Sequence, residues 1–237
     1  MTDTPLQPPP PPPPPPSTRP AFDFVKPFAF TFEDPEWVQK ILLGGIFVLA
    51  SMAIVGIFFL YGYLARLVRN VVEGVRYPLP AWDDLGEYFT EGARIFAVVV
   101  VYALPVMMVA MVAIVPAMIM EASDSDAARD VGGMIFTCLW CLVFPISLAL
   151  GLWMPAALLR VAIERRFSAG FELGQIWDFI RGNAGNYILA IVVRLIAGFI
   201  AQFGLALLCI GIIFTGFWAM LVGSYGFAQA YRLAPKR

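Results

Sequence analysis

The stretch YPLPAWDDLGEYFTEGARIF, residues 77–96, interrupts an otherwise apolar chain and decides how its fold is interpreted. Residues 41–65 before it and residues 95–120 after its acidic part carry no charged side chain. Between these runs the stretch places two prolines, a tryptophan and four acidic residues. Such an interruption predicts that the chain leaves an apolar environment, turns at its surface and goes back in.

The composition predicts an integral membrane protein. Of the 237 residues, 60% are apolar and only 14% are charged, whereas soluble domains carry about a quarter charged residues. Each long uncharged run exceeds the roughly 20 helical residues that cross a hydrocarbon layer, and lipid offers no partner to an open backbone group. We therefore expect an all-α fold, a polytopic α-helical membrane bundle. Its single domain, residues 21–237, has expected spans at about 38–65, 93–120, 131–160, 186–204 and 206–232.

Residues 1–20 are expected to form a disordered, proline-rich tail ahead of that domain. Pro8–Pro16 is an unbroken run of nine prolines, which favours an extended polyproline II helix. The run is either a solvated spacer or a docking ligand for an aromatic-lined groove on a partner.

The beginning of the first span is less clear. Residues 21–40 mix aromatic and charged side chains, which is typical of a membrane interface. Asp34 and Pro35 are the expected N-cap and first residue of the following helix. If residues 41–65 cross the membrane once, the tail lies outside, and if they form a re-entrant hairpin, it lies inside.

The charges predict the orientation of the chain. The connectors 66–94 and 160–186 and the C-terminal end are rich in arginine, whereas the loop 121–130 holds one arginine and four acids. By the positive-inside rule the basic connectors and the C-terminus face the cytoplasm. The expected location is the bacterial cytoplasmic (inner) membrane.

The two basic connectors resemble each other and indicate an internal helix-hairpin repeat. They align at an offset of about 90 residues, which brings Phe89 onto Phe179 and Gly92 onto Gly182. In the first connector, apolar residues at helical spacing oppose the acids, which predicts a short amphipathic helix on the cytoplasmic face. Its acids are expected to meet either the chain's own arginines (Arg66, Arg69 or Arg165) or those of a partner. The candidate interfacial or partner contacts are Trp37, Trp82, Asp83, Asp84, Glu87 and Glu91.

These motifs resemble those of the membrane-protein family known as domain of unknown function 4013, over about residues 28–232. The residues that carry the resemblance are Asp34, Pro35 and Trp37, then Gly62, Tyr63, Arg66 and Arg69, then Leu79, Pro80, Trp82, Asp83, Asp84 and Gly92. The resemblance implies a multi-pass prokaryotic membrane protein and supplies no activity.

Arg194 is the only charged residue away from the ends of an expected span, and a charge at that depth is costly enough to suggest a function. Either its side chain reaches back to the membrane surface, or it binds an anion or a lipid phosphate. Arg66, Arg69 and Arg160 are the other candidate contacts for an anion or a lipid headgroup.

Small residues predict close helix packing, within the chain or with another subunit. They are Gly211, Gly216, Gly223 and Gly226 on the last helix, and the pairs Ala219 with Gly223, Ser147 with Gly151, and Ala197 with Ala201. Cys138 and Cys141 share a helix face and are expected to be small buried apolar residues.

The sequence favours a non-catalytic function. The chain has no histidine and no recognisable catalytic motif, so we expect no catalytic residue, no metal and no cofactor. Its net charge of −1 implies no nucleic-acid partner. The expected partners are membrane lipid and other membrane subunits or copies of the chain. We therefore expect an accessory or scaffold subunit of a membrane assembly, and the alternative is a channel or transporter for a small anionic or lipidic solute.

Overall fold

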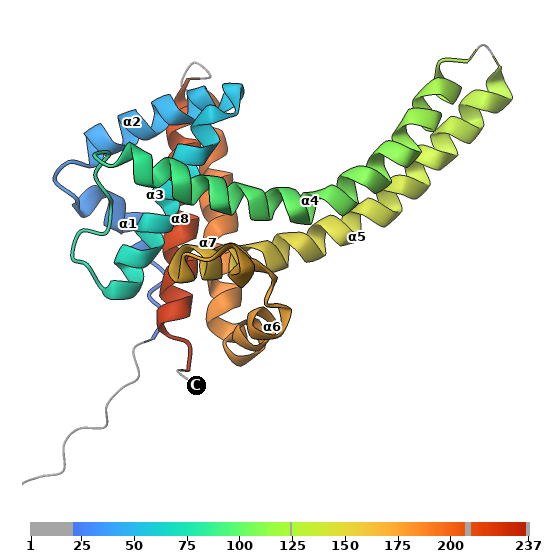
Figure 1. The fold of residues 1–237 in the computed structure, drawn as a ribbon. Helices are drawn as coiled ribbons and strands as arrows, with labels where there is room; N and C mark the ends of the chain where they lie inside the picture. The colour runs from blue at the N-terminus through green and yellow to red at the C-terminus, as the bar shows by residue number, and fades with distance from the viewer. Residues whose placement is uncertain (1–20, 124, 207–209, 236–237) are drawn as a thin grey trace, which may run out of the picture.

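The computed structural model describes residues 21–123, 125–206 and 210–235, and in this part of the chain every regular element is helical (Figure 1). The expected all-α fold class is therefore confirmed. Five helices are long and apolar enough to cross a membrane: α3 (Val55–Glu73), α4 (Leu85–Glu121), α5 (Asp126–Glu164), α7 (Ala184–Gln202, continued by a 3₁₀ turn to Ala206) and α8 (Gly211–Arg232). The proline run lies outside the described residues.

The first expected span, 38–65, is not one helix. The helix α2 (Trp37–Ala50) ends in a 3₁₀ turn, and α3 begins at Val55. At the turn a side chain on Gly56 would clash with the backbone of α2, so only glycine allows so close a return. The rings of Phe47 and Phe59 then meet 5.0 Å apart across the two helices. Residues 41–65 therefore contain two helices joined by a turn, and α3 alone is long enough to be a span.

The expected N-cap at Asp34 is also wrong. A short helix, α1 (Lys26–Glu33), ends just before Asp34, and α2 begins only at Trp37, with a bend of 106° between the two helices. The buried Asp34 carboxylate accepts a hydrogen bond from the Glu36 backbone N–H and lies 2.8 Å from the Lys40 ammonium. Asp34 therefore pairs with a lysine inside the fold, and this pair holds α1 and α2 at their bend.

The tryptophan of the first connector is packed inside the chain. The Trp82 indole stacks on the Tyr63 ring, with centroids 4.1 Å apart, and donates a hydrogen bond to the Lys40 carbonyl at 3.1 Å. The Tyr63 hydroxyl donates to the Pro80 carbonyl at 2.9 Å. Residues that carry the family resemblance thus tie α2, α3 and the connector together.

Two glycines bring α3 and α4 into backbone contact. A side chain on Gly62 would clash with the Tyr88 backbone, and one on Gly92 would clash with the Phe58 carbonyl. Asp84 caps α4 by accepting a hydrogen bond from the Glu87 backbone N–H at 3.0 Å. The separate amphipathic helix that we expected here is instead the first turns of α4, because the capped helix runs through Gly92 without a break.

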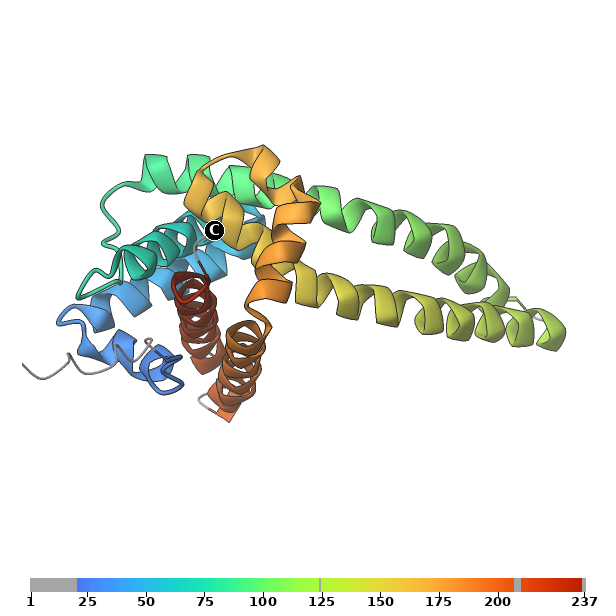
Figure 2. The ribbon, with the colours of Figure 1, turned by 90° about the horizontal axis from the view of Figure 1, so that it is seen from below.

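The helices α4 and α5 form a long arm that leaves the bundle (Figures 1 and 2). In each of these two helices only 6% of the most apolar 18-residue segment is buried within the chain. The corresponding share is 28–50% in α3, α7 and α8. Four prolines lie inside these uninterrupted helices, Pro105 and Pro116 in α4 and Pro145 and Pro155 in α5, and the arm curves along its length (Figure 1). Cys138 and Cys141 are exposed on α5, which contradicts the expected burial.

The second connector contains a separate helix, α6 (Leu173–Gly182), followed by the close pair α7 and α8. The Asn183 side chain, between α6 and α7, donates a hydrogen bond to the Ala230 carbonyl at 2.7 Å. Gly223 and Gly226 face α7, whereas Gly216 faces open space. The Gly211 backbone lies close to Gly204, 2.8 Å from a methyl group placed there. Ala197 and Ala201 are buried.

All the basic segments lie at one end of the bundle. The Arg69 guanidinium donates to the Ala162 carbonyl at 3.0 Å, and Arg232 lies beside Gly74. The end of α4 at Glu121 and the start of α5 at Asp126, both within the predicted acidic loop, lie at the far tip of the arm (Figure 1). The start of α2 also lies at the basic end, because Lys40 donates a hydrogen bond to the Leu79 carbonyl in the first connector.

Replacing Gly92 by alanine tests the contact between α3 and α4. Gly92→Ala should lower the free energy of unfolding by about 1–3 kcal/mol, because the new methyl group forces the two backbones apart. Thermal unfolding of the purified protein in detergent measures the change. The matched control is Gly182→Ala at the aligned position of the second connector, where nothing lies within 4 Å. Equal melting temperatures for the two variants would contradict the backbone contact.

Candidate functional site

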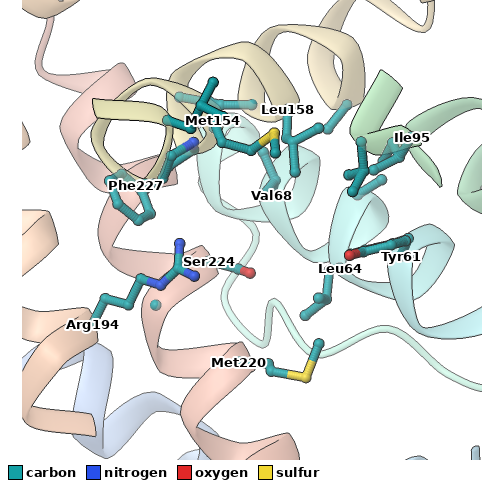
Figure 3. Close-up of a pocket in the computed structure, with 18 of the residues that line it drawn as sticks. Tyr61, Leu64, Val68, Ile95, Met154, Leu158, Arg194, Met220, Ser224 and Phe227 are labelled. Carbon is teal, nitrogen blue, oxygen red and sulfur yellow. The ribbon is translucent and has the colours of Figure 1, made fainter. Parts of the chain in front are cut away.

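A cavity of about 590 Å³ lies where α3, α4, α5, α7 and α8 meet (Figure 3). Every helix that lines it is long and apolar enough to cross a membrane. Arg194 is the only charged residue in the lining, and Tyr61, Ser147 and Ser224 supply its hydroxyl groups. The remaining wall is apolar or glycine, with Leu64, Ala65, Val68, Ile95, Val99, Ala103, Val106, Met107, Leu150, Gly151, Met154, Pro155, Leu158, Leu159, Ala162, Ala219, Met220, Gly223 and Phe227.

Arg194 reaches this cavity from the middle of α7. It lies ten residues after Ala184, or about 15 Å along the helix axis. Its stem packs on α8, where the arginine Cγ would lie 3.3 Å from a methyl group placed on Gly223. Figure 3 shows the guanidinium turned into the space that it shares with Ser224 and Tyr61. Glycine at 223 thus gives the arginine room to turn inward.

Arg194 has no ion pair or hydrogen bond within the described residues, although its guanidinium carries a fixed positive charge. The other predicted arginine contacts are all occupied. Arg66 lies 3.0 Å from Glu87, and Arg69 lies 2.6 Å from Glu91. Arg160 lies 2.7 Å from Glu172 and also donates a hydrogen bond to Gln175. Of the four candidate anion contacts, only Arg194 is left with its charge unmatched.

The acids of the first connector divide into two groups. Glu87 and Glu91 meet the chain's own arginines, as one of the two alternatives expected, and Arg165 pairs with both, at 2.5 Å from Glu91. Burial lowers the pKa of Arg165, but the Glu91 and Glu87 carboxylates outweigh burial and hold that pKa above its usual value. Asp84 serves as the helix cap, and Asp83 is exposed without an ion pair in the described part of the chain.

This ion-pair cluster lies on the packed face of α4, not on its solvent face. Glu91 is only 4% exposed and shares this face with the buried Tyr88 and Ile95, whereas Leu85 and Phe89 are exposed. The predicted amphipathic pattern placed the acids on the opposite side. The helix turns its acids inward because Arg69 approaches from α3 and Arg165 from the end of α5.

The predicted tryptophan contacts are both occupied inside the chain. Trp37 lies edge-on to the Phe32 ring at 5.2 Å, and Trp82 stacks on Tyr63. Both rings are partly buried and have contacts within the chain.

The sequence indicated Arg194 but not the cavity around it. Two pairs that we expected to be helix-packing seams, Ala219 with Gly223 and Ser147 with Gly151, line the cavity, and of these Gly223 also packs against the Arg194 stem on α7. Nothing lies within 4 Å of a methyl group added to Gly151, so the small residue leaves space and not a contact. Tyr61 and Ser224 carried no signal in the sequence, since single hydroxyls in apolar runs are common.

The described residues contain no group of His, Cys, Asp and Glu side chains that could hold a metal ion. A family model described as "Protein of unknown function (DUF4013)" matches residues 45–210. This range contains Arg194 and the contact between α3 and α4, but neither the Asp34 segment nor α8. No curated protein and no solved structure matches the chain.

Removing the Glu91 carboxylate tests the ion-pair cluster. Glu91→Gln should lower the free energy of unfolding by about 1–3 kcal/mol, because the partly buried Arg69 loses the carboxylate 2.6 Å away and keeps only Glu87, at 3.8 Å. The exposed Asp83 is the control, and Asp83→Asn should stay within about 0.5 kcal/mol of the wild type. Unfolding in a mixed-micelle titration measures both variants, and a Glu91→Gln protein as stable as Asp83→Asn would contradict the cluster.

Proposed function

This chain belongs to the DUF4013 family of proteins of unknown function, and we propose that it binds and moves a small anionic or lipidic solute through the cavity beside Arg194. The observation that carries the proposal is the unpaired Arg194 guanidinium at an apolar cavity between membrane-spanning helices. An unmatched charge there is costly. An anionic ligand would offset that cost by pairing with it.

We assign binding and passage to the cavity, and no reaction. Arginine stays protonated in proteins and cannot act as a general base. The lining offers hydroxyl groups but no carboxylate or thiol to activate them. A binding site needs only a charge and enough space, and the described lining supplies one arginine and a cavity of about 590 Å³.

We further propose the cytoplasmic membrane of a bacterium as the location, with the basic end of the bundle inside. The positive-inside rule supports this orientation, because the arginine-rich connectors and the C-terminal end lie together. The α2–α3 hairpin then favours a cytoplasmic N-terminus, since it brings Lys40 to the same end.

A second candidate is an accessory or scaffold subunit, and the α4–α5 arm favours it. The arm buries little of its apolar surface within the chain, and Trp140 on it is 56% exposed. Helices in lipid associate by close packing. An arm of this length gives another membrane subunit a continuous surface on which to pack.

Flux through proteoliposomes tests the transport proposal. The full-length chain would be reconstituted in phosphatidylcholine vesicles with two probes, chloride and a fluorescent phosphatidylglycerol. At least one probe should cross faster than in protein-free vesicles. Arg194→Leu should slow that flux about tenfold or more, because a hydrogen bond to a charged group contributes about 1.5–3 kcal/mol.

The control for charge is Arg181→Gln, which removes an exposed arginine at the end of α6, away from the cavity. This variant should keep the wild-type flux. Two results would contradict the proposal: neither probe moves, or Arg194→Leu transports as fast as Arg181→Gln.

Photo-crosslinking tests the second candidate. The side chain of Trp140 would be replaced by benzoylphenylalanine and the cells irradiated. A subunit packed on the arm should give a protein adduct of defined mass, and gentle extraction should recover the same protein in stoichiometric amount. Leu195, 66% exposed on α7, serves as the control position and should react with lipid. Lipid adducts alone at both positions would contradict an accessory role through the arm.

A further inference from the structure

We infer that the ligand of the cavity is an anionic membrane lipid, with its headgroup at Arg194 and an acyl chain along α4 and α5. This inference rests on the proposed function and specifies the class of ligand. It distinguishes a lipid from a small water-soluble anion, which the same guanidinium could also attract.

Three of the four polar side chains in the described lining come from α3, α7 and α8, whereas α4 and α5 contribute almost only apolar residues. Arg194 comes from α7, Ser224 from α8 and Tyr61 from α3, and Figure 3 shows Ser224 beside the guanidinium and the Tyr61 hydroxyl facing the same space from the other side. The α4 wall is wholly apolar, and Ser147 is the only hydroxyl on the α5 wall. A ligand that fits both sides has one charged end and one hydrocarbon end.

The size of the cavity favours a lipid over a small anion. Its volume of about 590 Å³ corresponds to about 20 water molecules at ~30 Å³ each. A small anion would leave most of this space unfilled, and it would lose its hydration for a single guanidinium and a few hydroxyls. An acyl chain fills apolar space without that cost.

The position of the cavity allows a ligand to come directly from the bilayer. Arg194 is itself exposed, so the cavity opens at the surface of the bundle beside it. The neighbouring α7 residues Leu195 and Ile188 are exposed and apolar, at 66% and 58%. A lipid can therefore enter sideways from the hydrocarbon layer.

The charge of the lining selects among lipids. It holds one cation and no carboxylate, so it can pair with a phosphate but offers nothing to the ammonium group of a zwitterionic headgroup. Basic pockets between membrane helices commonly hold anionic lipids. We therefore expect phosphatidylglycerol to bind more tightly than phosphatidylcholine with the same acyl chains.

Thermal unfolding of the full-length protein in detergent tests the inference. The protein would be titrated separately with phosphatidylglycerol, with phosphatidylcholine of identical chains, and with sodium sulfate. Phosphatidylglycerol should raise the melting temperature by roughly 5 °C at saturation. The other two additions should shift it by much less.

Three variants locate the lipid. Arg194→Leu should abolish the phosphatidylglycerol shift, and Arg194→Lys should keep part of it, because the charge remains. Gly151→Leu should reduce the shift, because the new side chain would occupy the part of the cavity on α5 where we place the acyl chain. The open space around Gly151 accommodates this side chain. Gly216→Leu on α8 is the matched control, because Gly216 has equally open space but does not line the cavity. Phosphatidylglycerol should raise the melting temperature of this variant as much as that of the wild type.

The outcomes separate the inference from the proposed function. A shift with sulfate and none with phosphatidylglycerol would overturn the lipid ligand and leave a small anion as the solute. Equal shifts with both lipids, unchanged in Arg194→Leu, would mean ordinary boundary lipid and would overturn the inference. No shift with any addition would overturn both the lipid ligand and the proposed binding at Arg194.

Discussion

The close approach of α3 and α4 is the contact on which the other features of the basic end depend. Gly62 and Gly92 let the two backbones touch, which no larger residue would allow. This approach fixes the register of the two helices, and it brings Arg69 of α3 within 2.6 Å of Glu91 of α4. The end of α5 joins the same cluster through Arg165. Charges that would be costly in an apolar bundle thus neutralise one another at one end of the molecule. The arm formed by α4 and α5 extends from this end.

Against this background Arg194 differs from the other three arginines that the sequence suggested as anion contacts. Arg66, the partly buried Arg69 and the buried Arg160 each have a carboxylate within about 3 Å. Arg194 has no such partner in the described residues, and its stem lies on Gly223, so that the guanidinium faces the cavity. The carboxylates at the basic end match those three arginines, whereas Arg194 is left unmatched beside an apolar space. This contrast, more than the cavity alone, favours an anionic ligand with a hydrocarbon part.

The sequence predicted the fold class well, because uncharged runs longer than a bilayer crossing are typical of membrane-spanning helices. It predicted less of what depends on contacts between distant residues. The sequence predicted Asp34 as a helix cap, but its carboxylate pairs with Lys40. The amphipathic helix predicted in the first connector is the first part of α4, because nothing breaks the helix after Asp84. Arg194 could be identified as a lone charge within a span. Its cavity could not be identified, since small residues such as Gly151 look alike in sequence whether they face a neighbouring helix or an open space.

The most direct test of a lipid site at Arg194 is to determine the structure of the protein, bound to an antibody fragment, in lipid nanodiscs that contain phosphatidylglycerol. We expect elongated density in the cavity, with a headgroup beside the Arg194 guanidinium and a chain between α4 and α5. We also expect this density to be absent in the Arg194→Leu protein. A cavity closed by packed side chains, or an Arg194 side chain that leaves the cavity for the membrane surface, would contradict the lipid site.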